Sequence, residues 1–187
     1  MSSKSWDERW MSTAVNKGTF SKDRSRKVGA VIVDADNDEV SNGWNGFPRK
    51  INDNVEVRHE RPLKYLWTEH SERNALYNAA RMGRATKGCR IYQTMYPCCD
   101  CARGIIQSGI VEVITVEPDW DDLTYKTEFA VTKEMLQEAG VAVRFVEGKT
   151  PERKPDVAAP ALPKTPWQKF VDAFMAFPLY VMWPGQK

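Results

Sequence analysis

Two short segments constrain this chain more than any other part of its sequence: His-Ser-Glu at residues 70–72 and Pro-Cys-Cys-Asp-Cys at residues 97–101. One histidine and two cysteines spaced by two residues supply three of the four ligands that tetrahedral Zn²⁺ prefers, which leaves one position open for water. Such a site favours hydrolysis, because the metal lowers the pKa of that water to about 7. We therefore expect metal ligands and a separate proton carrier, and these are His70, Cys98 and Cys101 for the metal and Glu72 for the proton.

A Cys-x-x-Cys pair also occurs in redox sites and in structural zinc sites, and both alternatives must be weighed. A closed structural site needs a fourth ligand, for which the sequence offers Cys89, Cys99 and His59. Cys99 lies between the two ligand cysteines, where a helical turn would point it elsewhere. Cys89 opens an apolar run and is expected to be a small buried core residue. A glutamate beside the metal has no role in a closed site, so the pattern favours a catalytic zinc.

Length and charge narrow the class of protein. A chain of 187 residues suits one main domain, at about 100–200 residues per domain. A net charge of +2 lacks the strongly basic character of proteins that follow a nucleic-acid backbone, which argues against nucleic acid as a partner. The sequence shows neither a signal-peptide pattern nor an apolar run of about 20 residues. Four cysteines, at least two of them on a metal, fit a reducing compartment, and we expect a cytoplasmic protein without membrane contact (host cytoplasm, if a virus encodes it).

Strand and helix patterns alternate along the chain. The periodicity predicts helices from residue 6 to a stop at Gly18 and at 69–82, 98–108 and 129–139, and strands at 28–33, 39–43, 90–96, 110–116 and 141–146. Residues 44–68 are expected to form one long, functional loop. This order predicts an α/β domain with three layers, α/β/α, in which helices cover both faces of a five-stranded sheet. The zinc ligands and Glu72 would then lie where two helices begin.

The two zinc segments match the His-x-Glu…Pro-Cys-x-x-Cys signature of zinc-dependent nucleobase deaminases. Their surroundings resemble the deoxycytidylate (dCMP) deaminases over about residues 5–147, in Val28-Gly-Ala-Val-Ile-Val33, Gly43-Trp-Asn-Gly-Phe-Pro48, Glu69-His-Ser-Glu-Arg-Asn-Ala75 and Ile105-Ile-Gln-Ser-Gly-Ile110. The resemblance implies a cytidine-deaminase-like fold with a mixed sheet, and hydrolysis of dCMP to dUMP and ammonia for thymidylate synthesis. Alternatives are a deaminase that also acts on dCTP or on cytosine or adenine in a polynucleotide, and a catalytically silent zinc module, against which Glu72 argues.

Further residues are candidates for holding the nucleotide. The resemblance implies that Asn45 contacts the deoxyribose hydroxyl, although Asn45-Gly46 also suits a plain turn. The loop at 22–27 precedes the first strand and is a candidate clamp for the 5′-phosphate, although a charged loop is also typical of a solvated surface. We expect substrate contacts from Asn45, Arg24, Ser25, Lys27 and Val28. The backbone N–H of Cys98 is expected to stabilise charge at the reacting carbon.

The resemblance also implies regulation. Members of this family often assemble as hexamers that are activated by dCTP with Mg²⁺ and inhibited by dTTP. Here the candidate allosteric residues are Gly43, Trp44, Asn45 and Gly46, with Trp44 where the family commonly has Tyr. Ser71 stands where Ala is usual. Because residues 44–68 contain His59 but no cysteine, we expect one zinc per chain.

The sequence predicts a boundary between a catalytic domain at residues 1–147 and a C-terminal arm at 148–187. The arm is a proline-punctuated tether followed by a short amphipathic helix at about 167–177. It would pack on its own subunit or on a neighbour, or alternatively dock a partner or a membrane surface. Trp120 follows the fourth strand and could stack on the base or on a neighbouring subunit, or pack in the core.

Overall fold

A computed structural model describes residues 5–154 together with Lys169 and Asp172. The chain divides into two compact units, Met1–Val157 and Ala158–Lys187. In the second unit Lys169 and Asp172 are helical, and the rest of the helix predicted at 167–177 lies outside the described residues. Among the described residues no helix is both long and apolar enough to cross a membrane.

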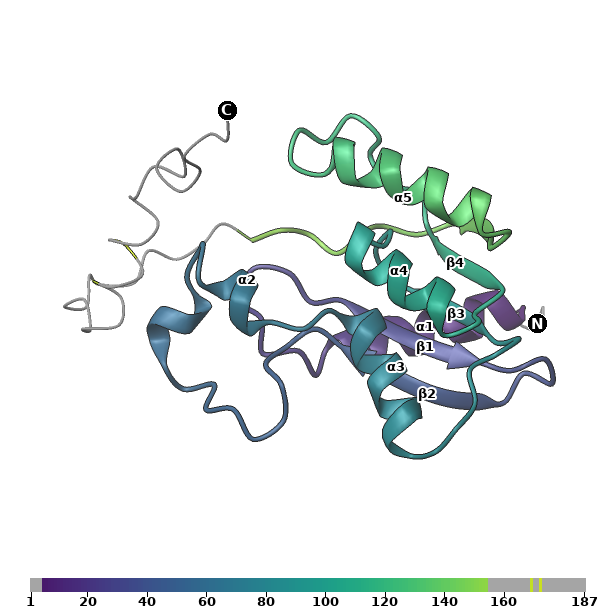
Figure 1. Cartoon of the computed structure of the whole chain (residues 1–187), viewed down its shortest axis with the longest axis horizontal. Coiled ribbons are helices and arrows are strands. Elements are labelled where there is room, and N and C mark those ends of the chain that lie inside the picture. Colours follow the sequence, from purple (N-terminus) through teal and green to yellow (C-terminus); the bar gives the residue numbers. More distant parts are fainter. Residues whose placement is uncertain (1–4, 155–168, 170–171, 173–187) are drawn as a thin grey trace, which may run out of the picture. The chain divides into compact units, whose positions relative to one another are not determined.

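The centre of the first unit is a five-stranded sheet in the order β2-β1-β3-β4-β5. Its strands are β1 (Gly29–Val33), β2 (Glu39–Trp44), β3 (Arg90–Gln93), β4 (Glu112–Val116) and β5 (Ala142–Val146). β1 runs antiparallel to both β2 and β3, whereas β3, β4 and β5 are parallel (Figure 1). The mixed five-stranded sheet confirms the prediction, although β3 ends at Gln93 and not at Tyr96.

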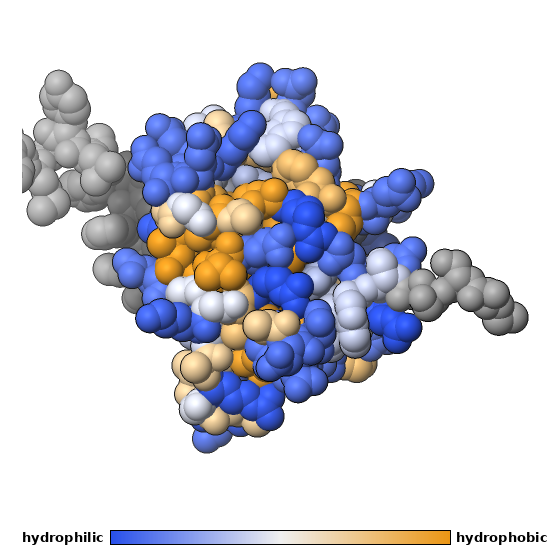
Figure 2. Space-filling model, turned by 90° about the vertical axis from the view of Figure 1, so that its right-hand side faces the viewer, coloured by the Kyte–Doolittle hydropathy of each residue, from blue (hydrophilic) through white to orange (hydrophobic). Residues whose placement is uncertain are grey.

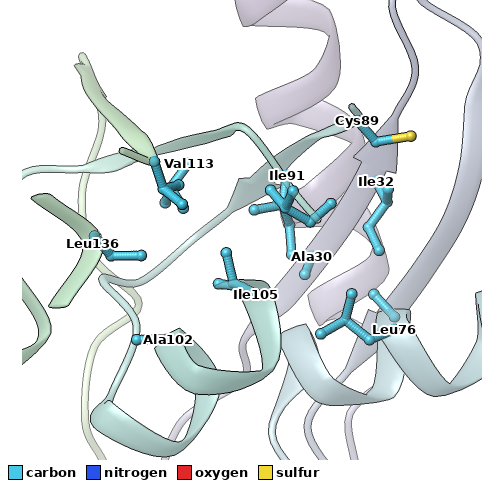
Figure 3. Packing of buried hydrophobic residues seen from close by; sticks show 12 residues of the cluster. Ala30, Ile32, Leu76, Cys89, Ile91, Ala102, Ile105, Val113 and Leu136 are labelled. Atoms are coloured by element: carbon cyan, nitrogen blue, oxygen red, sulfur yellow. The ribbon is translucent and has the colours of Figure 1, made fainter. Parts of the chain in front are cut away.

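Helices cover both faces of this sheet, which confirms the three-layer architecture. On one face α1 (Trp6–Gly18) buries Met11 and Ala14 against strand residues that include Val31 and Tyr92. On the other face lie α3 (Ser71–Arg81), α4 (Cys99–Gln107) and α5 (Lys126–Glu138). Figure 3 shows Leu76 and Ile105 pointing from these helices toward Ile32 and Ile91 of the sheet. Burial of each such side chain contributes about 1.5–3 kcal/mol to folding.

The start of α1 and its packing both follow from local sequence. The Ser5 hydroxyl accepts a hydrogen bond from the Glu8 backbone N–H (3.2 Å), and the Glu8 carboxylate accepts one from Ser5 N–H (2.6 Å), which makes a capping box. A side chain at Gly29 would place Cβ 2.0 Å from the carbonyl oxygen of Ala14. Glycine at this position therefore allows α1 to lie directly on β1.

The segment between β2 and α3 contains more regular structure than expected. It includes a 3₁₀ helix, η1 (Glu56–His59), and a short helix, α2 (Lys64–Trp67). The Phe47 and His59 rings stack at 4.7 Å, and the Arg58 guanidinium lies 4.1 Å from the Trp67 ring centroid. Helices of four residues show no hydrophobic period, so the prediction of one irregular loop was wrong here.

Two contacts position the start of α3. A Cβ at Gly43 would lie 2.4 Å from both the Ala75 backbone nitrogen and the Ser71 carbonyl oxygen, so glycine lets α3 pack closely on β2. The backbones of Gly46 and Glu69 exchange hydrogen bonds of 3.0 and 2.8 Å. Together these contacts hold the residue just before His70.

Candidate active site

His70, Cys98 and Cys101 converge although 28 residues separate the first two in sequence. His70 Nδ1 lies 3.4 Å from Cys98 Sγ and 3.5 Å from Cys101 Sγ, and all three ligand atoms lie within 4.8 Å of one another. Tetrahedral zinc, with Zn–S of about 2.3 Å and Zn–N of about 2.0–2.1 Å, separates sulfur from nitrogen by about 3.5 Å. The chemistry and spacing of these donor atoms therefore fit zinc. Among residues 5–154, Lys169 and Asp172, this is the only such group of potential metal ligands.

The local structure explains the convergence. His70 is the N-cap of α3 and Cys98 is the N-cap of α4, so two helices begin at the metal cluster. Partial positive charge at helix N-termini favours thiolate over thiol. Hydrogen bonds from Cys101 and His70 lower the pKa of Cys98 to about 4 despite its burial, while the contact with Cys98 raises the pKa of His70 to about 9. The hydrogen bond between Cys98 and Cys101, together with burial, raises the pKa of the Cys101 thiol. Metal binding would displace the protons on these groups.

Glu72 lies in the first turn of α3 and is almost fully buried, with 4 % of its surface exposed. Burial raises the pKa of its carboxyl group, and the Ser71 hydroxyl donates a hydrogen bond of 2.8 Å to Oε2. Glu72 is not part of the ligand cluster. It is therefore a buried carboxyl group that lines the same cavity as His70 and Cys98, with a pKa above its usual range.

The other possible zinc ligands lie elsewhere. Cys99 Sγ is 3.4 Å from the Glu128 carbonyl oxygen and accepts from the Thr132 hydroxyl at 3.7 Å, so it faces α5. Cys89 is buried in the hydrophobic core, as expected. His59 Nε2 lies 2.7 Å from the Asp53 carbonyl oxygen, in the segment before α2. These positions leave three protein ligands and an open fourth position, which is the arrangement of a catalytic zinc.

A cavity extends from the metal cluster. His70, Cys98 and Glu72 line this cavity, together with Tyr96 and Phe129. Four cationic side chains also line it, and these are Arg26, Arg61, Lys64 and Arg153. One cavity is therefore lined both by residues of the metal cluster and by four cationic side chains.

Three of the predicted substrate residues reach this cavity: Ser25, Val28 and Asn45. Asn45 is buried, and its Oδ1 accepts from the Val28 backbone N–H at 2.8 Å. Its Nδ2 donates to the Arg26 carbonyl oxygen at 2.9 Å. The Asn45 amide thus holds the 26–28 backbone at the cavity wall.

The cations expected to clamp a phosphate do not line the cavity. The Arg24 guanidinium pairs with the Glu56 carboxylate, with an Nη2–Oε2 distance of 2.9 Å. Lys27 Nζ lies 3.5 Å from the Thr19 carbonyl oxygen. Their neighbour Arg26 takes the place in the cavity that the sequence argument gave to them.

Lys64 was missed because it comes from α2, which was not predicted. Its Nζ lies 2.8 Å from Asp23 Oδ1 and also contacts the Ser25 hydroxyl. Asp23 accepts further hydrogen bonds from the backbone N–H groups of Ser25 and Arg26, at 2.8 and 3.1 Å. Two short-range signals could have indicated this cluster: the single acidic residue, Asp23, within the basic 22–27 loop, and a lysine shortly before the zinc-ligand helix.

The candidate allosteric stretch makes contacts inside the fold. The Trp44 ring packs edge-on against Phe20 at 5.3 Å, and its carbonyl oxygen accepts from Asn74 Nδ2 at 2.8 Å. Trp120 lies outside the cavity lining and contacts Tyr96 at 5.3 Å and Phe145 at 6.2 Å. Of the roles considered for Trp120, packing behind the cavity wall is the one these contacts support.

Comparisons with known proteins agree with this geometry. Residues 4–117 match the sequence model of the family described as cytidine and deoxycytidylate deaminase zinc-binding region. An uncharacterised deaminase from the luxG 3′ region of Aliivibrio fischeri is 39% identical over 142 residues, covering 75% of this chain and 93% of the relative. Human deoxycytidylate deaminase is 34% identical over 144 residues, covering 74% and 78%.

A solved structure is also similar. The dCMP deaminase from the cyanophage S-TIM5, in complex with dCMP and dUMP, superposes with a TM-score of 0.63 at 26% identity. The match covers 78% of this chain and 100% of the cyanophage chain.

Proposed function

The chain belongs to the cytidine and deoxycytidylate deaminase family, and on that premise we propose that it hydrolyses dCMP to dUMP and ammonia. One observation carries the proposal: a single cavity holds the zinc-ligand cluster and Glu72 together with four cationic side chains. The zinc-ligand cluster and Glu72 supply a hydrolytic centre. The four cations favour an anionic substrate such as a nucleotide.

Zinc held by His70, Cys98 and Cys101 would act as a Lewis acid that makes water a nucleophile near neutral pH. Glu72 takes a proton from the attacking water and delivers one to ring N3, which makes C4 of the base more electrophilic. It then moves the second proton of that water, from the hydroxyl group added at C4, to the departing amine. In balance, the C4–N bond breaks, a C4–O bond forms, and water and dCMP become dUMP and ammonia.

The chain's polar groups supply the remaining contacts. The backbone N–H at Cys98, the N-cap of α4, is placed to stabilise charge that develops at the reacting carbon. Asn45 uses one of its two amide N–H donors on Arg26, so the other is available for the deoxyribose hydroxyl. Ser25 and Val28 border the same cavity. We assign phosphate recognition to cations that line the cavity, in place of Arg24 and Lys27.

The proposal includes the finer features that the family resemblance implies. The enzyme acts in the cytoplasm and supplies dUMP for thymidylate synthesis. It assembles as a homo-oligomer, which the resemblance implies is a hexamer. dCTP with Mg²⁺ activates it and dTTP inhibits it, through Gly43, Trp44, Asn45 and Gly46. Figure 2 shows apolar residues gathered near the middle of one face and bordered by hydrophilic residues. Exposed apolar residues that gather on one face are typical of protein interfaces, which supports the proposal of self-association. The solution mass, measured with and without dCTP and Mg²⁺, tests this part.

The activity itself is tested by incubating the zinc-loaded protein separately with dCMP, dCTP, deoxycytidine and a cytosine-containing DNA oligomer while ammonia release is measured. We expect turnover of dCMP and much less of deoxycytidine and DNA. Turnover of dCTP as well would extend the substrate range to triphosphates. Turnover of the oligomer alone would overturn the nucleotide assignment and leave the zinc chemistry in place.

A further inference from the structure

Charged side chains connect the two helices that carry the metal ligands, close to the ligands themselves. α3 and α4 lie side by side, with His70 as the N-cap of α3 and Cys98 as the N-cap of α4 (Figure 1). The ligand cluster has the spacing that zinc requires only while the first turns of these helices keep their separation and direction. A contact between the two turns therefore acts on the geometry of the cluster.

Glu69, the residue before His70, is one end of this connection. Its carboxylate oxygen Oε1 accepts a hydrogen bond of 3.1 Å from the His70 backbone N–H and another from Arg73 Nε. Glu69 and Arg73 also form an ion pair, and their side chains are only 18 % and 26 % exposed. The backbone of the ligand histidine and the Arg73 guanidinium are thus held by the same carboxylate oxygen.

Asp100, the residue before Cys101, is the other end. It lies in the first turn of α4, and its Oδ2 is 3.5 Å from Arg73 Nη1. The aliphatic stem of Arg73 also lies close to α4, because a Cβ at Gly104 would be 3.8 Å from Arg73 Cγ. Arg73 therefore reaches from α3 to α4 with both its charge and its stem. We call its contacts with Glu69 and Asp100 the Arg73 bridge.

We propose that Arg73 is a positioning residue, which holds the first turns of α3 and α4 at the separation that zinc requires and so sets the affinity of the site for the metal. Arginine suits this role because its planar guanidinium presents donors to two carboxylates at once. A single exposed ion pair contributes little, whereas a partly buried network of several charges contributes more. This inference rests on the zinc site of the proposed function and not on its choice of dCMP as substrate.

A neighbouring arginine offers a matched control. Arg103 pairs with the other carboxylate oxygen of Asp100, but both residues belong to α4, so this ion pair lies within one helix. The Arg103 side chain is 58 % exposed, compared with 26 % for Arg73. Removal of the Arg103 charge therefore takes a partner from Asp100 and leaves the link between the helices in place.

The test compares the zinc-loaded wild-type protein with Arg73→Gln, Arg73→Lys and the control Arg103→Gln. Glutamine removes the charge and keeps part of the aliphatic stem. Competition with a chelator measures the zinc dissociation constant of each protein at low and at high salt. The absorption spectrum of each Co²⁺-loaded protein reports the geometry of the metal ligands. Thermal unfolding verifies that each zinc-loaded variant is folded.

We expect Arg73→Gln to raise the zinc dissociation constant by about 10- to 100-fold and to change the Co²⁺ spectrum. Arg73→Lys recovers part of the affinity, because it keeps the charge and loses the planar fork that reaches both carboxylates. The difference between the wild type and Arg73→Gln shrinks at high salt, since salt screens partly exposed charges. Arg103→Gln binds zinc as the wild type does.

Asp100 gives an independent measurement of the link between the helices. Asp100→Asn weakens the contact with α4 and leaves the pair of Arg73 with Glu69, so it also serves if Arg73→Gln does not fold. Two substitutions that act through one contact are not additive. We therefore expect the double variant Arg73→Gln/Asp100→Asn to bind zinc more tightly than the product of the two single effects would give.

The inference is overturned if Arg73→Gln binds zinc as tightly as the wild type, if Arg103→Gln weakens zinc binding equally, or if the effects of the substitutions at Arg73 and Asp100 simply multiply. A wild type that needs Arg73 for tight zinc binding but releases no ammonia from dCMP refutes the proposed function and supports the Arg73 bridge. An Arg73→Gln variant with wild-type zinc affinity that turns over dCMP has the opposite meaning.

Discussion

At the scale of single residues, the proposed chemistry depends on Glu72, a carboxylate that is buried and lies outside the ligand cluster. Glu72 is 4 % exposed and lies two positions after His70, in the same first turn of a helix. Burial raises its pKa, and the hydrogen bond from Ser71 limits that rise. A buried carboxyl group with a raised pKa suits the role of proton carrier that we propose for Glu72.

Replacement of Glu72 by glutamine removes the proton carrier and keeps the shape of the side chain. We expect Glu72→Gln to lower kcat for dCMP by at least about 10²- to 10⁴-fold, because one group serves as both base and acid. Zinc content stays close to that of the wild type, since Glu72 is not a ligand. Ammonia release and metal analysis measure the two effects, with the exposed Glu134→Gln as control. Loss of zinc, or substantial remaining activity, contradicts the role of Glu72.

Ser71 provides a test of pH dependence. Its hydroxyl stabilises the charged form of Glu72, so Ser71→Ala raises the pKa of Glu72 further. Because Glu72 must be deprotonated to accept the first proton, the acidic limb of the kcat/KM profile moves to higher pH in the variant. Activity then falls most on the acid side and recovers as pH rises. A limb that is unchanged or that moves to lower pH would show that Ser71 does not act through Glu72.

At the scale of elements, the site depends on how closely α3 lies against β2. Both backbone groups next to Gly43 belong to α3, at the Ser71 carbonyl and the Ala75 nitrogen. The helix that carries His70 at its N-cap and Glu72 in its first turn is therefore placed by a residue in a strand. α4 supplies the two cysteines independently, so a shift of one helix changes the distances among the ligands.

An added methyl group at Gly43 tests this packing. Cβ would lie 2.4 Å from two backbone atoms, so α3 must move. We expect Gly43→Ala to lower the free energy of unfolding by about 1–3 kcal/mol and to weaken zinc binding. Gly46→Ala is the matched control, because a Cβ there meets nothing within 4 Å. Denaturant unfolding and metal analysis give the result. Equal stability and zinc content in the two variants would mean that the approach of α3 to β2 is not critical.

At the scale of the whole molecule, bound metal would join the starts of α3 and α4, which belong to segments far apart in sequence. The ligands come together only in the folded chain, so metal binding adds its free energy to folding. Two thiolates and an imidazole favour zinc over a hard cation such as Mg²⁺.

Removal of the metal follows from this coupling. We expect a strong chelator to abolish dCMP turnover and to lower the temperature of thermal unfolding, because the folded state loses its bound ligand. Added Zn²⁺ restores both properties, and added Mg²⁺ restores neither. Calorimetry and ammonia release, before and after chelation, measure these changes. Full activity in the metal-depleted protein would refute the zinc mechanism.

Much of the fold and part of the site could be predicted from short-range patterns. The spacing of hydrophobic residues along the sequence identified the five strands and four main helices, because each strand or helix buries one of its faces. The Cys-x-x-Cys spacing and the His-x-Glu pair pointed to the residues that the structure brings together at the metal cluster. In each case the signal lies within a few residues, where one helical turn sets the geometry.

The rest was decided by tertiary structure. Arg24 and Arg26 are two residues apart and chemically identical, yet one pairs with Glu56 and the other lines the cavity. No local pattern separates them, because their roles depend on which distant segments pack against the 22–27 loop. The same holds for Lys64 on the unexpected α2 and for Arg153 in the segment that follows β5. The sequence by itself determined the candidate metal centre, whose ligands follow helix geometry, whereas the cations that line the cavity come from segments that only folding brings into contact.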